Sequence, residues 1–113
     1  MKCIHQLIMI LGIVTALSQV CLGCRNTRDE FSYRCIELIE VEAYQEALEN
    51  CSQAILLGSK TATDYVRRGY VRTQLGEYDK AIEDYQKAAK LFLKEGNKRN
   101  YQGVQEDLKK LHD

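Results

Sequence analysis

The stretch that decides the fold is YVRRGYVRTQLGEYDKAIEDYQKA, residues 65–88. When the chain is shifted by 34 residues against itself, this stretch aligns with residues 31–54. Aromatic residues then match aromatic residues, and small residues match small ones. Self-similarity at a fixed period of this length is typical of stacked repeats of one supersecondary unit. The aligned pairs are Phe31 with Tyr65, Cys35 with Gly69, Tyr44 with Tyr78, Ala47 with Ala81 and Ala54 with Ala88.

The spacing within each unit predicts two antiparallel helices joined by a short turn. Small residues such as Gly69 on the first helix and Ala81 on the second allow close approach, because larger side chains would push the pair apart. Gly76 stands where the C-terminus of a helix prefers a left-handed residue. The tyrosines at positions 65, 78 and 85 are expected to fill the space between this pair and the next helix. The sequence therefore predicts a helical hairpin in each unit.

The unit at residues 62–95 resembles a tetratricopeptide repeat, because its aromatic and small residues fall at the spacings of that family. Residues 28–61 resemble a degenerate copy of the same repeat. The pattern departs from the family at Arg68, a position that is usually apolar. It also lacks the proline that often ends the second helix, so we expect the helix that begins near Tyr78 to continue to about Glu95. The resemblance implies an all-α fold with two hairpins in a short α-solenoid.

A further helix is predicted at residues 98–111. Its apolar residues recur at spacings of three and four, which places them along one face of a helix, and the opposite face is charged. Such a helix after the last repeat resembles the capping helix that closes a solenoid. The chain from residue 91 to this helix is also similar to repeats that are common in cyanobacteria. The apolar residues are Tyr101, Val104, Leu108 and Leu111.

Composition points to one small domain and away from catalysis. The chain has 113 residues, 45% of them apolar, and its 16 basic residues balance 16 acidic ones. The zero net charge removes a global argument for nucleic acid as a partner. His5 lies in the N-terminal segment and His112 is the penultimate residue, so neither is placed within the fold as a base or metal ligand. We therefore expect no enzymatic activity, no metal and no cofactor.

Charged residues of the second repeat are expected on its surface. Asp79 with Glu83, and Asp84 near Lys87, have the spacing of solvated pairs on an exposed helix. The arginines of residues 67–72 form the only noticeable basic patch, and no nucleic-acid module surrounds them. Charge is uneven along the chain, with a sum of −4 over residues 25–59 and +3 over residues 60–113. That difference could orient a partner.

Residues 1–24 are predicted to be a targeting or anchoring segment. Lys2 precedes an apolar run of eleven residues, 7–17, and no further charge occurs before Arg25. This arrangement is typical of a signal peptide. A transmembrane helix needs roughly 20 predominantly apolar residues, a length that the segment reaches only if its polar flanks are counted. A retained membrane anchor and an ordinary buried helix remain alternatives.

The end of that segment, CLGC at residues 21–24, resembles the lipobox of bacterial lipoproteins. Gly23 and Cys24 fit the pattern, whereas Cys21 stands where the family usually has leucine. The resemblance implies cleavage before Cys24 and lipidation of its thiol. We therefore expect a bacterial protein that is exported to the cell envelope and associated with the membrane on the periplasmic side, with plain secretion as the alternative.

Two further cysteines, Cys35 and Cys51, belong to the first predicted hairpin. With a turn near Glu42 and Ala43, they lie at about the same height on facing helices. A disulfide between them is a reasonable hypothesis if the chain reaches an oxidising compartment. The alternative is that both are small residues that only pack against each other.

The resemblance also implies a function, which is binding of a protein partner. In tetratricopeptide proteins the first helix of each hairpin lines a concave groove, and the corresponding residues here include Ile39 and Thr73. An apolar and aromatic strip of this kind suits an extended or helical peptide. We expect an adaptor or assembly factor, and the alternative is a self-association module that completes its core by dimerising. The groove candidates are Tyr33, Ile36, Val66, Arg67, Tyr70 and Gln74.

Overall fold

The computed structural model describes residues 27–58 and 60–113 of the chain. The described residues form five helices and no strand, so the predicted all-α fold is confirmed. The predicted targeting segment at residues 1–24, with its lipidation candidate Cys24, lies outside the described residues. No helix of the described ranges is long and apolar enough to cross a membrane. The helices are α2 (Thr27–Glu40), α3 (Tyr44–Leu56), α4 (Ala62–Gln74), α5 (Tyr78–Lys94) and α6 (Lys98–His112).

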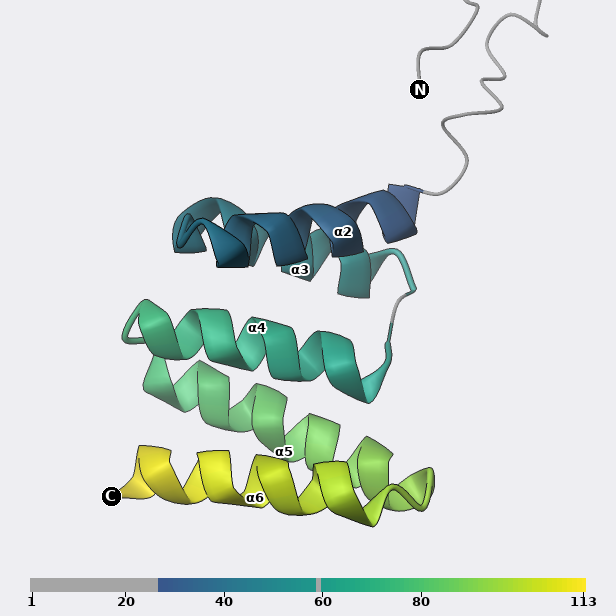
Figure 1. Cartoon of the computed structure of the whole chain (residues 1–113), viewed down its shortest axis with the longest axis vertical. Helices are drawn as coiled ribbons and strands as arrows, with labels where there is room; N and C mark the ends of the chain where they lie inside the picture. Colours follow the sequence, from purple (N-terminus) through teal and green to yellow (C-terminus); the bar gives the residue numbers. More distant parts are fainter. Residues whose placement is uncertain (1–26, 59) are drawn as a thin grey trace, which may run out of the picture.

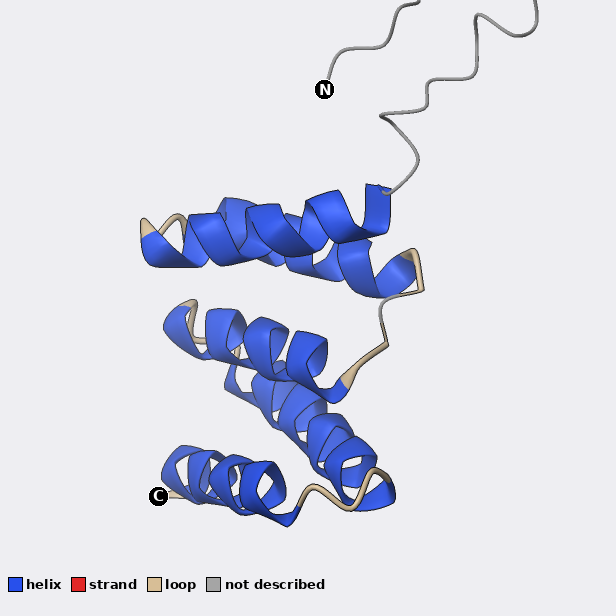
Figure 2. Ribbon diagram, turned by 45° about the vertical axis from the view of Figure 1, so that its right-hand side comes forward, coloured by secondary structure: helices blue, strands red, loops and turns tan. Residues whose placement is uncertain are grey.

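Consecutive helices run antiparallel and stack into a short solenoid (Figure 1). Helices α2 and α3 form hairpin 1, and α4 and α5 form hairpin 2. The two hairpins meet through α3 and α4, and α6 packs on α5 at the end of the stack (Figure 2). Helices α2, α4 and α6 therefore run in the same direction, which places the C-terminal ends of all three on one side of the molecule (Figure 1).

Capping residues and left-handed turns set the ends of the helices. The hydroxyl of Thr61 accepts a hydrogen bond from the backbone N–H of Asp64 at 3.3 Å, which satisfies a donor in the first turn of α4. Gly76, with φ of 78°, provides the left-handed residue between α4 and α5. In hairpin 1 the same position is occupied by Glu42, which adopts φ of 58° although it has a Cβ. Both turns thus follow the same path with different residues.

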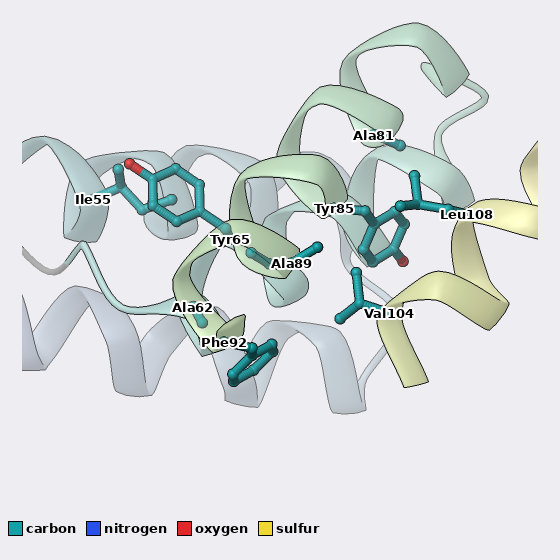
Figure 3. Close-up of a cluster of buried hydrophobic side chains, with 10 residues drawn as sticks. Ile55, Ala62, Tyr65, Ala81, Tyr85, Ala89, Phe92, Val104 and Leu108 are labelled. Atoms are coloured by element: carbon teal, nitrogen blue, oxygen red, sulfur yellow. The ribbon is translucent and has the colours of Figure 1, made fainter. Parts of the chain in front are cut away.

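The larger core cluster joins hairpin 2 to its neighbours on both sides (Figure 3). Tyr65 lies beside Ile55 of hairpin 1, whereas Tyr85 lies beside Val104 and Leu108 of α6. Each of these side chains is at most 8% exposed. The apolar stripe predicted for α6 is therefore the face that packs on α5, as expected of a helix that closes the stack.

Small residues allow the helices of hairpin 2 to approach closely. A Cβ added to Gly69 would lie 3.2 Å from the ring of Tyr85, which is closer than ordinary van der Waals contact. Ala81 is completely buried. Tyr78 does not fill the interhelical space as predicted, because it is the first residue of α5 and its side chain is 54% exposed. That prediction was wrong for Tyr78.

Hairpin 1 is held by a smaller cluster with a disulfide at its centre. Cys35 of α2 and Cys51 of α3 are joined through their sulfur atoms, with Cα atoms 5.0 Å apart and a sequence separation of 16 residues. Both cysteines are 2% exposed. Ala47 and Val71 complete the cluster, and Val71 comes from α4. Hairpin 1 thus obtains part of its core from hairpin 2.

The prediction that Asp84 lies on an exposed helix surface is wrong. The residue is 3% exposed, and its carboxylate accepts two hydrogen bonds from Arg68, one from Nε at 2.9 Å and one from Nη2 at 2.8 Å. Nη1 of Arg72 donates a third at 2.9 Å. A buried carboxylate keeps its charge only when such donors surround it. The interaction also explains why Arg68 occupies a position that is usually apolar.

The same network corrects the predicted basic patch on α4. Arg68 and Arg72 point toward the buried carboxylate of Asp84, and their side chains are 18% and 17% exposed. Arg67 is the remaining arginine, and its Nη1 lies 3.2 Å from Oδ1 of Asp64. Because each arginine has an acidic partner, the three do not form a free basic surface. The spacing along α4 showed only the three arginines. The common partner of two of them, Asp84, follows Arg72 by 12 residues and Arg68 by 16, so local spacing does not connect Asp84 with them.

Candidate functional site

The candidate site is a groove of about 360 Å³ on the side of the molecule where α2, α4 and α6 approach one another. Helix α5 provides its floor through a single side chain. The groove is therefore built mainly from the first helix of each hairpin and from the closing helix. Its lining residues are Ile36, Ile39, Glu40, Val66, Arg67, Tyr70, Tyr85 and Asp107.

The surface of the groove is mostly apolar. Ile36 and Ile39 of α2 are partly buried, and Val66 of α4 packs against the larger core cluster. Tyr70 is 40% exposed, so a large part of its ring is available to a partner. An exposed aromatic side chain beside aliphatic ones is typical of the centre of a protein interface.

Tyr85 reaches the floor of the groove because Gly69 leaves room for its ring. It is only 4% exposed, and burial raises its pKa above the ordinary value of about 10, although a hydrogen bond with Thr73 acts in the opposite direction. At the rim, Tyr70 lies edge-on to Tyr44 with ring centroids 6.3 Å apart. The hydrogen bond between these hydroxyls raises the pKa of Tyr44. Tyr44 and Tyr85 are therefore uncharged near neutral pH.

Three charged side chains stand at the rim of the groove. The guanidinium of Arg67 is held by Asp64 within α4, at 3.2 Å. Asp107 of α6 is paired with Lys110 at 3.5 Å, and both side chains are well exposed. Glu40 is the last residue of α2 and is exposed. The groove therefore combines an apolar centre with charges that remain accessible at its edge.

A second hollow, of about 420 Å³, continues the groove toward the start of α6. The two hollows share Val66 and Asp107, so they are adjacent along the same surface. Phe92 and Val104 add apolar surface, and Arg99 stands at the far end, in the first turn of α6. The combined groove is long enough to contact α2, α4 and α6 at once.

Four of the six residues predicted for the groove come together there: Ile36, Val66, Arg67 and Tyr70. Tyr33 and Gln74 do not line it. Tyr33 is 69% exposed on α2, one turn before Ile36 and outside the hollow. Gln74 is exposed at the C-terminal end of α4.

Sequence reasoning missed three lining residues, Glu40, Tyr85 and Asp107. Tyr85 was assigned to the space between helices, and its contact with the groove depends on the missing side chain at Gly69. Gly69 was therefore the one feature of the sequence that could have indicated the position of Tyr85. Glu40 and Asp107 carry no comparable signal, because a charged residue on a helix surface is ordinary in sequence.

The described residues offer no evident site for a metal ion. No group of three or more histidine, cysteine or acidic residues in the described ranges is arranged to hold one. Cys35 and Cys51 are joined to each other.

Comparison with known proteins identifies the repeat. The family model of the tetratricopeptide repeat matches residues 62–92, which span α4 and most of α5. No curated protein and no solved structure matches the chain. The match supports a role in protein–protein interaction. Residues 62–92, in an all-helical stack of hairpins, are therefore similar to a tetratricopeptide repeat in both sequence and helical arrangement.

Proposed function

We propose that this protein is an adaptor or assembly factor that binds a segment of a partner protein in the groove between α2, α4 and α6. The observation that carries the proposal is the apolar lining of the groove, in which the first helices of both hairpins present Ile36, Val66 and Tyr70 to the same space. The tetratricopeptide match on hairpin 2 supports a role in protein interaction. Aromatic and arginine side chains in well-packed pockets supply most of the energy in such interfaces, and Tyr70 is the aromatic side chain that the groove exposes.

Site-specific photo-crosslinking tests this function. Tyr70, which is 40% exposed and lines the groove, is replaced by a photoreactive phenylalanine analogue, and Tyr78, which is 54% exposed outside the groove, is the matched control. We expect protein adducts from position 70 and few from position 78. Equal labelling from both positions would place the interaction elsewhere.

We propose further that the protein is exported in a bacterium and tethered to the envelope membrane through residues 1–24. The lipobox-like residues Gly23 and Cys24 support this proposal. The bond between Cys35 and Cys51 also supports it, because disulfides persist in oxidising compartments. Intact mass spectrometry of the protein expressed with its own N-terminus tests it. Cleavage before Cys24 with added acyl chains is the expected result, and a full-length chain in the cytoplasm would refute export.

Self-association is a second candidate, because within residues 27–58 and 60–113 no helix packs over the half-buried apolar residues at the α2 end of the stack. Phe31 of α2 occupies the position that corresponds to Tyr65, which is covered by Ile55 of the preceding hairpin (Figure 3). No described helix precedes α2, and Phe31 lines a hollow of about 740 Å³ together with Leu48.

Sedimentation over a range of concentrations tests this second candidate. A dimer that Phe31→Ser disrupts would support self-association through hairpin 1. A monomer at all concentrations would exclude self-association and leave binding of another protein as the proposed function.

A further inference from the structure

We propose that the groove selects a partner segment of defined charge pattern, with apolar side chains in its middle, a basic group at one end and an acidic group at the other. The basic end would lie beside Glu40 and the acidic end beside Arg99. This inference rests on the proposed function, because it names the kind of segment that the groove accepts and the direction in which the segment lies.

The end of the groove at Glu40 carries uncompensated negative charge. Glu40 is the final residue of α2, and the last turn of this helix contains no basic residue. The backbone N–H groups of the following turn already donate to the carbonyl oxygens of Glu37, Leu38 and Ile39, so the negative charge at this end is mainly that of the Glu40 side chain. No ion pair among the described residues involves Glu40. A lysine or arginine of the partner would complement the carboxylate of Glu40.

The opposite end of the groove has the reverse character. Arg99 lies in the first turn of α6, which contains no acidic residue. The N–H groups of a helix N-terminus carry a partial positive charge that acidic residues usually balance. Arg99 adds a further positive charge at this end, and no acidic residue in the same turn balances it. Arg99 is exposed, and no ion pair within the described ranges engages it. A glutamate or aspartate of the partner would complement this end.

The parallel directions of α2 and α6 separate the two charges. Because α2 and α6 run the same way, the C-terminal end of α2 and the N-terminal end of α6 lie at opposite sides of the groove (Figure 1). The apolar residues Val66, Phe92 and Val104 lie in the second hollow, next to the first. A segment that crosses the groove therefore passes from Glu40 over an apolar centre to Arg99. The two charged side chains between these ends, Arg67 and Asp107, are paired with Asp64 and Lys110. Complementary charges at the ends fix orientation and partner choice more than affinity.

The test uses three fluorescein-labelled peptides that share one pattern of leucines at helical spacing. The first has lysines at one end and glutamates at the other, the second has lysines at both ends, and the third has glutamates at both ends. Binding to the protein is measured by fluorescence anisotropy at low salt. The first peptide is expected to bind about twofold to fivefold more tightly than the others, which is the effect of an exposed ion pair.

Two variants of the protein assign the effect to the two ends. Glu40→Gln is expected to weaken both peptides that carry lysines and to leave the glutamate peptide unweakened. Arg99→Gln is expected to weaken both peptides that carry glutamates. Glu46→Gln and Lys94→Gln make the same changes in charge at exposed positions outside the groove, and they are expected to have no selective effect.

The outcomes separate this inference from the proposed function. Equal binding of the three peptides, lost on Tyr70→Glu, would overturn the charge preference and retain the groove as a binding site. The same loss of affinity in Glu46→Gln as in Glu40→Gln would also overturn it, because net charge would then be the cause. Absence of binding by all three peptides would count against both the inference and the groove.

Discussion

Hairpins 1 and 2 follow the same backbone path, but they hold their helices together by different chemistry. At the centre of hairpin 2, Gly69 accepts the ring of Tyr85 at close distance. The positions that correspond to them in hairpin 1 are Cys35 and Cys51, which form the disulfide. A close packing contact in one repeat is thus replaced by a covalent bond in the other. The geometry of the repeat can be kept even when the residues that usually secure it are absent.

The two hairpins differ again at the turn and on the second helix. Asp84 joins α5 to α4 through Arg68 and Arg72. The corresponding residue of hairpin 1 is Asn50. Its side chain donates a hydrogen bond to the carbonyl oxygen of Glu46 at 2.8 Å, which lies in the same helix. Hairpin 1 also has Glu42 instead of glycine at its left-handed turn residue. Hairpin 1 therefore relies on its disulfide, and hairpin 2 on packing and a buried ionic network.

The largest expected effect comes from removing the buried acid of hairpin 2. Asp84→Ala leaves Arg68 and Arg72 without their partner in a mostly buried position, so we expect the free energy of unfolding to fall by about 3 to 5 kcal/mol. Urea unfolding followed by circular dichroism measures the change. The control is Glu83→Ala, at the exposed neighbouring position, which should change stability by less than about 0.5 kcal/mol. Similar effects of the two variants would contradict the buried network.

Reduction of the disulfide in hairpin 1 is expected to have the next largest effect. Closing a loop of about 15 residues stabilises a fold by roughly 3 kcal/mol in the entropic model, and the separation here is 16 residues. Unfolding of the oxidised protein should therefore become easier by about that amount on adding a reductant. A variant with both Cys35→Ala and Cys51→Ala should not respond to the reductant. Free thiols at both Cys35 and Cys51 in peptide mapping of the oxidised protein would exclude the bond.

A methyl group at Gly69 tests the close contact between Gly69 and Tyr85, which in hairpin 1 is replaced by the disulfide. Gly69→Ala places a Cβ 3.2 Å from the ring of Tyr85, and we expect a loss of about 1 to 3 kcal/mol from overpacking. Gly103→Ala is a matched control, because it is also within a helix and a Cβ there meets nothing within 4 Å. The control should gain up to about 1 kcal/mol from helix propensity. Thermal unfolding of both variants shows whether the two changes have opposite signs.

The smallest expected effect comes from the left-handed turn residue of hairpin 1. Its replacement is also the only change that is expected to stabilise this hairpin. Glu42 adopts φ of 58°, a conformation that costs a residue with a Cβ roughly 1 kcal/mol more than glycine. Glu42→Gly is therefore expected to raise the free energy of unfolding by about that amount, and Gly76→Ala to lower it similarly. A loss of stability in Glu42→Gly would mean that the Glu42 side chain makes a contribution larger than the backbone cost.

The repeat pattern was sufficient to predict most of the fold. Each helix start and stop depends on residues that are close in sequence, such as Gly76 in the turn and the apolar stripe of α6 around Val104 and Leu108. Groove residues such as Ile36 and Tyr70 were predictable because they repeat at the same position of each first helix. Asp84 was assigned wrongly, since its partners lie on another helix and helical spacing alone cannot distinguish a buried acid from a solvated one.

Local sequence by itself determined the helices, the hairpins and their order, because helical periodicity, small residues and turn glycines act over a few residues. Only the tertiary structure decided which charges are buried, which tyrosine reaches the groove and how the groove ends are charged. Tyr85 lines the groove because Gly69 lies opposite it, and Glu40 and Arg99 mark opposite ends because α2 and α6 run in the same direction. These properties depend on distances between helices that are remote in the chain, and periodicity does not contain them.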